Sequence, residues 1–369
     1  MDEITDEMRA AASYWEKTAW KQSPDLLIVG GGIVGASTAL FYKEKYPDHD
    51  VLIVERGEIP EGASTRNAGF ACIGSMSEHL ADMEISGKET VLNRIERRWR
   101  GLKLLRKTLG DEAIGYEPVG GREIFTDEEL YDTCRERITE LNKELANRLG
   151  EKEIYSITQI EGLLAIKNRV EGALHSGKLM RSLHQKVAEK GVRVWWNKSV
   201  DSVKPGSVTL RDGEEIQADK IVLATNGFTS GLTDTTIKPA RGYLFVTKPI
   251  KNMPWRGTFH YNKGYIYFRN VGDSLMLGGA RDLDKERETT SEFGVNETIK
   301  NHLLEFANEV LNLPEGWEVE MEWSGIMGMT PDKEPIIKPM DENIWMAAGL
   351  SGMGIAIGMD VAKKIVEKL

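Results

Sequence analysis

The chain has 369 residues, of which 40% are hydrophobic and 29% charged, so it is long enough for two domains or one large one. Its net charge of −10 argues against nucleic acid or an anionic membrane surface as a partner. The sequence has no apolar run of about 18 residues, so membrane insertion is not expected. Residues 1–23 lack the basic start and apolar core of a signal peptide, and we interpret them as an N-terminal extension whose aromatic residues cover the domain surface.

The cysteines and histidines indicate neither disulfides nor metal binding. Cys72 and Cys134 lie far apart and form no CxxC motif, which predicts reduced core thiols in a cytoplasmic protein. The six histidines show no metal-ligand spacing, so a metal site is not expected.

Residues 25–56 have the pattern strand, glycine turn, helix, strand, acid, with G-x-G-x-x-G at Gly30, Gly32 and Gly35. Gly30 permits the turn, Gly32 lets a pyrophosphate approach the backbone, and Gly35 lets the helix pack closely on the strand. Glu55 lies 55 − 35 = 20 residues beyond Gly35, the spacing at which a carboxylate meets the adenosine ribose hydroxyls. The stretch predicts a dinucleotide site, with NAD and FAD both open; the alternative is a glycine turn in another βα unit.

The next segment, GASTRNAG at residues 62–69, mixes small, hydroxyl, amide and guanidinium groups. This mixture suits a loop and helix start lying against a phosphate and a flat ring, although an ordinary solvated loop is the alternative.

Residues 88–149 are predicted to form an insertion between two parts of the nucleotide fold. Apolar periodicity predicts a helix over 88–109, whose basic residues we interpret as a solvated face paired with nearby acids rather than a partner site. A strand is expected over 117–125. Thr126 and Glu129 offer a capping box for a following helix that ends at Gly150.

The rest of the chain alternates between nucleotide-fold and sheet-rich segments. We expect a helix over 179–190, a strand over 192–196, a β-meander over 200–216 and a buried parallel strand from 221. Residues 238–324 predict an antiparallel sheet covered by a helix over 297–311. A strand over 344–348, a second glycine turn and a helix over 355–368 follow.

Together these features resemble the D-amino-acid oxidase, glycine oxidase and sarcosine oxidase family of FAD enzymes, which also includes gamma-glutamylputrescine oxidoreductase with a similar GAS-x-RN-G stretch. The resemblance covers nearly the whole chain from residue 25 onwards. It implies an α/β fold in which a Rossmann-like FAD-binding domain of the glutathione-reductase type (24–87, 150–236 and 325–369) carries an inserted α+β substrate domain with an antiparallel sheet (88–149 and 237–324).

The resemblance also assigns residues to FAD. The Cys that tethers FAD in monomeric sarcosine oxidase falls on Gly325, so the cofactor is expected to be non-covalent. The glycine turn before the last helix is placed against the flavin ring, where the helix dipole stabilises negative charge. The expected FAD contacts are Gly30, Gly32, Ile33, Val34, Glu55, Arg56, Ser64, Thr65, Arg66, Asn67, Ala68, Gly69, Val200, Thr225, Gly227, Gly325, Gly349, Ser351, Gly352, Met353 and Gly354.

On the substrate side the resemblance implies Tyr265 as a substrate-facing residue, with Arg269, Met327 and Met353 as further candidates for the catalytic site. Met327 stands where amino-acid members carry an Arg for the substrate carboxylate. Either Arg241, Arg269 or Arg66 replaces that Arg, or the substrate is an amine without an α-carboxylate.

The activity implied is hydride transfer from the C–N carbon of an amino acid or small amine to flavin N5. Water then hydrolyses the imine to a keto acid or aldehyde plus ammonia or amine, and oxygen is reduced to hydrogen peroxide. Met276 replaces a Lys that promotes the oxygen reaction in sarcosine oxidase, so a dehydrogenase passing electrons to a quinone or carrier is the alternative. A non-catalytic flavin-binding protein acting through a partner is an alternative of another class. The sequence does not indicate an oligomeric state.

Overall fold

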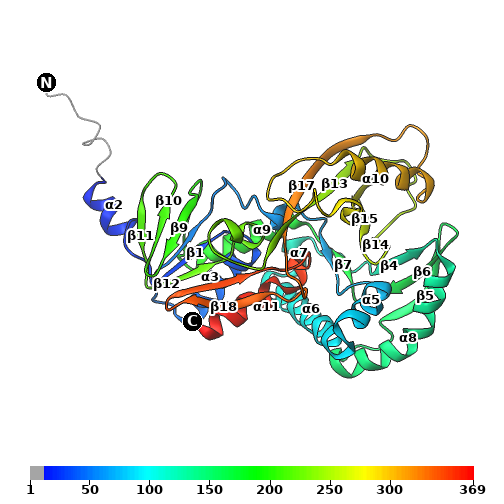
Figure 1. Cartoon of the computed structure of the whole chain (residues 1–369), viewed down its shortest axis with the longest axis horizontal. Coiled ribbons are helices and arrows are strands. Elements are labelled where there is room, and N and C mark those ends of the chain that lie inside the picture. The colour runs from blue at the N-terminus through cyan, green and yellow to red at the C-terminus, as the bar shows by residue number, and fades with distance from the viewer. Residues whose placement is uncertain (1–11) are drawn as a thin grey trace.

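A computed structural model describes residues 12–369 of the chain (Figure 1). Within the predicted N-terminal extension it contains a short helix, α2 (Tyr14–Ala19). The expectation that aromatic residues of this extension cover the domain surface is wrong, because Tyr14, Trp15 and Trp20 are 70%, 75% and 62% exposed. Residues 1–11 of the extension lie outside the described residues.

A six-stranded sheet carries the predicted dinucleotide turn. Its strand order is β18-β19-β12-β1-β2-β8, and all neighbours pair in parallel except β18 with β19. All four residues of β1 and of β2 are buried, which explains their continuous apolar sequences. The strands are β1 (Leu26–Val29), β2 (Val51–Val54), β8 (Arg193–Trp195), β12 (Lys220–Leu223), β18 (Ile336–Asp341) and β19 (Ile344–Ala348).

The two faces of this sheet are covered by different elements. Leu26 and Ile28 of β1 pack with helices α3, α6, α9 and α11, whereas Leu27 and Val29 pack with the predicted β-meander. Alternation of side chains along the strand places successive residues on opposite faces. The covering elements are α3 (Ile33–Lys45), α6 (Lys88–Leu109), α9 (Ser176–Glu189), α11 (Gly354–Lys368), β9 (Val200–Lys204), β10 (Ser207–Leu210) and β11 (Glu215–Gln217).

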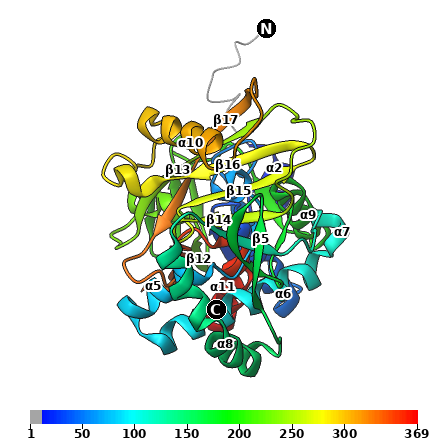
Figure 2. The same cartoon turned by 90° about the vertical axis from the view of Figure 1, so that its right-hand side faces the viewer.

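An eight-stranded sheet forms the second part of the molecule, in the order β17-β13-β16-β15-β14-β4-β6-β5 (Figure 2). Its neighbours are antiparallel except β14 with β4. Helix α10 (Glu297–Glu309) packs on it over a core in which Phe259 and Phe268 stack at 4.7 Å. The strands are β4 (Gly121–Phe125), β5 (Tyr155–Ile160), β6 (Leu163–Asn168), β13 (Lys238–Thr247), β14 (Thr258–Tyr261), β15 (Ile266–Val271), β16 (Ser274–Gly279) and β17 (Val319–Met329).

The predicted α/β class, with a Rossmann-like part and an antiparallel-sheet part, is confirmed. Two segments belong to a different sheet than predicted, or extend beyond the predicted bounds. Strands pair with partners far away in the sequence, so local patterns do not show which sheet a strand joins. Residues 155–168, expected with the nucleotide fold, form β5 and β6 of the larger sheet. Strand β17 also continues past the expected boundary at residue 325. The domain boundaries themselves remain a prediction.

Helices α5 (Met76–Ser86), α7 (Asp111–Ile114) and α8 (Glu128–Leu149) complete the inserted region. Asp127, rather than Thr126, caps α8 by accepting a hydrogen bond from the Leu130 amide at 3.1 Å. Among residues 12–369, no helix has both the length and the apolar character needed to cross a membrane.

The arginines of α6 pair with acids, as predicted, but two of them are buried rather than solvated. Arg94 is 5% exposed and pairs with Asp82, and Arg98 is 3% exposed and pairs with Glu78. Arg98 and the other charges around it hold the pKa of Glu78 at about 2, against the opposing effect of burial. These pairs fix α6 to α5 from inside the molecule.

Candidate active site

A cavity of about 1000 Å³ lies between the two sheets and collects most of the predicted site residues. It is bounded on one side by the first glycine turn and on the other by β15, β17 and the second glycine turn. The predicted residues that line it are Gly30, Gly32, Ile33, Val34, Glu55, Arg56, Ser64, Arg66, Asn67, Ala68, Val200, Thr225, Tyr265, Gly325, Met327, Ser351, Gly352, Met353 and Gly354.

Four predicted cofactor contacts, Thr65, Gly69, Gly227 and Gly349, stand behind the cavity wall instead. An added Cβ on Gly227 would lie 2.5 Å from the carbonyl oxygen of Met327. Gly69 and Gly349 have φ values of 74° and 80°, which favour glycine. These residues shape the loops that carry the lining residues.

Arg269, a predicted catalytic candidate, does not line the cavity. It is 8% exposed, and its Nη1 donates to the carbonyls of Gly69 at 3.1 Å and Leu174 at 2.8 Å. Burial lowers its pKa. Arg269 therefore joins strand β15 to the backbone at Gly69 and Leu174, outside the cavity.

The first glycine turn is as tight as the motif requires. Gly30 has φ 105°, and a Cβ there would lie 2.8 Å from the carbonyl oxygen of Ala224. A Cβ on Gly35 would lie 1.9 Å from the carbonyl oxygen of Gly30. Helix α3 begins after Gly32, which has no side chain to cap it, so the amides of Val34 and Gly35 in its first turn are available to an anion.

Glu55 is the acid at the end of β2 and lines the cavity while only 6% exposed. Its two carboxylate oxygens accept hydrogen bonds from the Gly31 amide at 2.7 Å and the Gly57 amide at 3.2 Å. Burial raises its pKa, against those two hydrogen bonds. The carboxylate is therefore fixed in orientation beside the glycine turn, where a ribose is expected.

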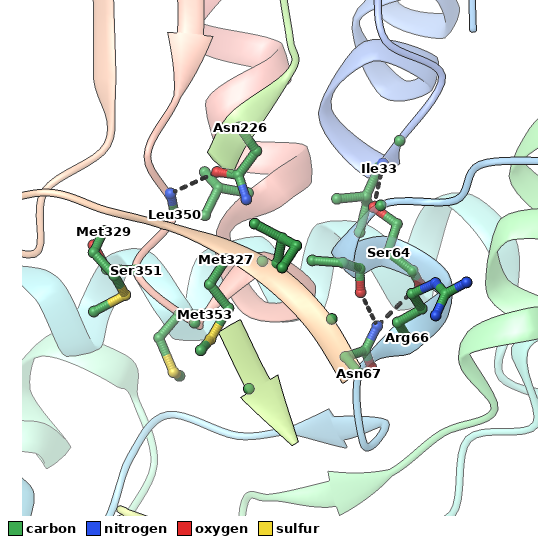
Figure 3. Close-up of a pocket in the computed structure, with 18 of the residues that line it drawn as sticks. Ile33, Ser64, Arg66, Asn67, Asn226, Met327, Met329, Leu350, Ser351 and Met353 are labelled. Carbon is green, nitrogen blue, oxygen red and sulfur yellow. Dashed lines mark hydrogen bonds between the residues drawn. The ribbon is translucent and has the colours of Figure 1, made fainter. Parts of the chain in front are cut away.

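The GASTRNAG segment contains the short helix α4 (Ala63–Arg66) and is joined to α3. Ser64 Oγ accepts a hydrogen bond from the Ile33 amide at 2.9 Å (Figure 3). The Asn67 side chain donates to the carbonyls of Ala63 and Ser64, both at 2.9 Å. The predicted loop is thus an ordered wall of the cavity rather than a solvated segment.

The second glycine turn is held by Asn226, which lines the cavity but was not predicted. Its Oδ1 accepts hydrogen bonds from the amides of Gly349 at 3.1 Å and Leu350 at 3.2 Å (Figure 3). Ser351, with φ 48°, donates its amide to the Gly328 carbonyl at 2.9 Å. The position of an Asn after a buried parallel strand was the available signal, since carboxyl ends of such strands meet at ligand sites.

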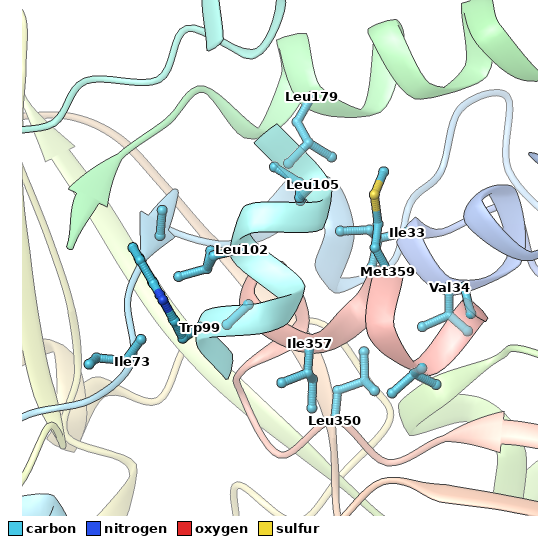
Figure 4. Packing of buried hydrophobic residues seen from close by; sticks show 14 of the residues in the cluster. Ile33, Val34, Ile73, Trp99, Leu102, Leu105, Leu179, Leu350, Ile357 and Met359 are labelled. Carbon is cyan, nitrogen blue, oxygen red and sulfur yellow. The ribbon is translucent and has the colours of Figure 1, made fainter. Parts of the chain in front are cut away.

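Packing beneath this turn fixes the start of α11. A Cβ on Gly101 of α6 would lie 2.0 Å from the Ala356 carbonyl oxygen, and one on Gly358 would lie 2.9 Å from Ile33. Figure 4 shows Ile33, Ile357 and Met359 in the same buried cluster. The first turns of α3 and α11 are therefore held in fixed positions at one cavity.

The wall formed by the larger sheet is aromatic. Tyr265 lies in the turn before β15, and Tyr267 of β15 lines the cavity beside Phe70 of β3 (Phe70–Ala71), with ring centroids 5.8 Å apart. Burial raises the pKa of Tyr267 to about 12. Tyr267 was not predicted, because nothing in YIYFR distinguishes the cavity-facing tyrosines without the sheet register.

His260 of β14 and Cys72 also line the cavity and meet Glu171, with their ligand atoms within 4.8 Å of one another. Burial disfavours the charged form of His260, but Glu171 at 3.1 Å outweighs it and raises the pKa of His260. The other Glu171 oxygen accepts from the amides of Ile73 and Gly74. We interpret the group as a buried ion pair beside an inert thiol, since burial raises the Cys72 pKa.

Methionines and cations complete the lining. Met327, Met329 and Met353 form an apolar patch (Figure 3). Lys263, Arg281 and Lys333 add cationic groups to the same lining. Met276 is not among the lining residues.

These residues fit a dinucleotide of the size of FAD. Its phosphates would meet the first turn of α3, its ribose would meet Glu55, and its ring would reach the second glycine turn. The cavity volume is at the upper end of the ~300–1,000 Å³ typical of ligand sites.

Comparisons with known proteins agree with this fit. The FAD dependent oxidoreductase (DAO) family model matches residues 25–368. Gamma-glutamylputrescine oxidoreductase of Escherichia coli (strain K12) is 24% identical over 97% of this chain and 88% of that protein.

Two solved structures share the fold. L-proline dehydrogenase from P. horikoshii superposes with a TM-score of 0.75 at 17% identity, covering 94% of this chain and 93% of its own. Glycine oxidase from Geobacillus kaustophilus has a TM-score of 0.73 at 20% identity, covering 94% and 95%. The chain belongs to the DAO family of FAD-dependent oxidoreductases.

Proposed function

We propose that the protein oxidises the C–N bond of an amino acid or small amine. The observation that carries this proposal is that the phosphate-binding start of α3 and the tyrosine wall of β15 open on one cavity. When bound, FAD supplies the hydride acceptor. The chain therefore has to bind the substrate, orient it toward the flavin and shield the reaction from water.

The roles of the chain's own groups follow from their positions. Tyr265 and Tyr267 offer a flat surface and two hydroxyls to the substrate. Met327 and Met353 exclude water near the second glycine turn, and the start of α11 stabilises negative charge at the ring edge. We assign the substrate-contacting roles to Tyr265, Met327 and Met353, and assign none to Arg269.

We further propose that FAD is held without a covalent bond in a cytoplasmic protein. Gly325 stands where a relative has its tethering Cys, and the thiol of the lining residue Cys72 is kept protonated by its raised pKa. Both cysteines are free and buried, which suits a reducing compartment.

Oxygen is the proposed electron acceptor, supported by the cations Lys263 and Arg281 in the cavity wall, since positive charge favours transfer of electrons to oxygen. A dehydrogenase using a quinone or carrier is the second candidate. Met276 favours it, because it replaces a Lys and is not among the lining residues.

The test is anaerobic mixing of the FAD-loaded protein with L- and D-amino acids, N-methyl amino acids and polyamines while flavin absorbance is followed. Bleaching by one class supports the proposed oxidation. Admission of air then separates the acceptors: recovery of absorbance within seconds supports oxygen, and absorbance that stays bleached for minutes supports the dehydrogenase. If no compound bleaches the flavin, the non-catalytic binding protein becomes the better account.

A further inference from the structure

Arg281 is a cation in the cavity wall whose side chain has no partner among residues 12–369. It opens the short helix η2 (Arg281–Asp284) after β16 and is partly exposed. Arg241 pairs with Glu288 at 2.7 Å and Arg287 with Asp284 at 3.8 Å, whereas Arg281 forms no ion pair or side-chain hydrogen bond within residues 12–369. Its charge acts on Tyr267, opposing the effect of burial on that phenol.

The backbone is shaped to bring Arg281 to this wall. Gly279 has φ 113°, and a Cβ there would lie 1.9 Å from the Tyr265 carbonyl oxygen. Ala280 has φ 55°, which costs energy for a residue with a Cβ, and it donates its amide to the same carbonyl at 2.7 Å. The turn that ends β16 is therefore tied to Tyr265, so Arg281 and Tyr265 are positioned together.

Other arginines considered for a substrate carboxylate are already engaged. Arg241 makes a two-point contact with Glu288 through Nε and Nη2. Arg269 donates to loop carbonyls. Arg66 donates to the Ser324 carbonyl and lies 4.3 Å over the Phe293 ring.

The lysines of the wall are weaker candidates. Lys333 is bound to Asp82 at 2.6 Å. Lys263 is exposed in the turn before Tyr265 and lacks the planar fork that matches a carboxylate. It is the natural competitor for the same role and can be tested beside Arg281.

We propose that Arg281 binds the α-carboxylate of the substrate, so that the substrate class is an α-amino acid rather than a plain amine. This rests on the proposed oxidation of a C–N bond. The planar guanidinium forms two parallel charge-assisted hydrogen bonds with a carboxylate, and the Tyr267 phenol lies on the same wall. Arg281 thereby anchors the carboxylate, which the uncharged side chain of Met327 cannot do.

Two measurements test this on the FAD-loaded protein. The first is the affinity of benzoate and acetate, followed by perturbation of the flavin spectrum, in wild type, Arg281→Met, Lys263→Met and the exposed control Arg287→Met. We expect Arg281→Met alone to weaken carboxylate binding by roughly 10- to 100-fold with FAD content unchanged, as for loss of hydrogen bonds to a charged group. Arg281→Lys should recover part of the loss.

The second compares amino acids with their decarboxylated amines as substrates: glycine with methylamine, sarcosine with dimethylamine and proline with pyrrolidine. We expect bleaching by the acids only, and a KM raised by Arg281→Met more than kcat is lowered. Unchanged carboxylate affinity in Arg281→Met, or a larger loss in Lys263→Met, overturns the assignment of Arg281. Equal bleaching by the amines overturns the substrate class.

Failure of the proposed function is distinguishable. If no compound bleaches the flavin but benzoate binding still depends on Arg281, the oxidation proposal fails and the anchoring role stands.

Discussion

The two ends of the cavity differ in how firmly the chain holds the side chains to which we assign ligand contacts. At the nucleotide end, both oxygens of Glu55 and the amide of Asn67 are engaged by neighbouring backbone. At the substrate end, Arg281 and the Tyr265 hydroxyl have no hydrogen-bond partner within residues 12–369. The first end is preorganised for a group common to the whole family, and the second leaves groups for a substrate to engage. Specificity is therefore expected where bonding within the chain is incomplete.

The largest effect is expected from Gly35→Ala, which tests how rigid the nucleotide end is. The new methyl group would lie 1.9 Å from the Gly30 carbonyl oxygen, so α3 has to move from β1. We expect a loss of about 3 kcal/mol in the free energy of unfolding together with loss of FAD, as for overpacking of a rigid core. Gly62→Ala is the control, because no atom lies within 4 Å of that Cβ. Chemical denaturation measures the free energy of unfolding of both variants. Equal stability of Gly35→Ala and Gly62→Ala would contradict the close packing of α3 on β1.

Glu55→Ala tests the same end without a steric clash. It removes the ribose partner and leaves the Gly31 and Gly57 amides unpaired, so the dissociation constant for FAD is expected to rise roughly 10- to 100-fold. Equilibrium titration with FAD after dialysis measures this change. The exposed Glu58→Ala serves as control. Full FAD stoichiometry in Glu55→Ala after long dialysis would remove the ribose assignment.

Tyr265→Phe tests the substrate end, where the Tyr265 hydroxyl has no hydrogen-bond partner in the part of the chain that the structure describes. Stability and FAD content should stay at wild-type values, while substrate KM or kcat changes by roughly 3- to 10-fold, the value of one hydrogen bond. Steady-state kinetics on a substrate from the bleaching screen provides the measurement. Kinetics identical to wild type would show that the hydroxyl does not touch the substrate.

The smallest effect concerns pH and the His260–Glu171 pair. Because the pKa of folded His260 is raised, the stability from its charged form is fully present below its ordinary pKa of about 6.5 and is lost as pH rises through the folded value. The stability difference between wild type and His260→Asn should therefore shrink as the pH rises above about 6.5. Denaturation midpoints across this range measure it, with His302→Asn as control. A pH-independent difference would mean that His260 is neutral in the folded protein.

The sequence predicted local structure well at the nucleotide end. Spacing within one βαβ unit is enough to identify Gly30, Gly32, Gly35 and Glu55. The structure places all of them on the cavity except Gly35, which is buried. The substrate end was less predictable, because its wall is assembled from residues far apart in the chain.

Asn226, Tyr267 and Arg281 illustrate what spacing does not show. Asn226 accepts hydrogen bonds from amides more than 120 residues away in the sequence. The direction in which Tyr267 faces depends on the register of β15 with β16. Arg281 became a candidate only after Arg269 and Arg241 were found to be engaged within the chain. The membership of β5 and β6 in the larger sheet was missed for the same reason.

The close contact of α11 with α3 and α6 has a consequence for biogenesis. Ile33 and Gly358 touch although they are 358 − 33 = 325 residues apart, and β19 completes the sheet beside β12. On the ribosome, the nucleotide turn must therefore wait for residues 344–368 before the cavity can close, and such distant contacts slow folding. Because residues from both ends of the chain line the cavity, the FAD site is complete only in the closed form. FAD should therefore stabilise newly folded chains by mass action, and supply of the cofactor should set the yield of folded protein.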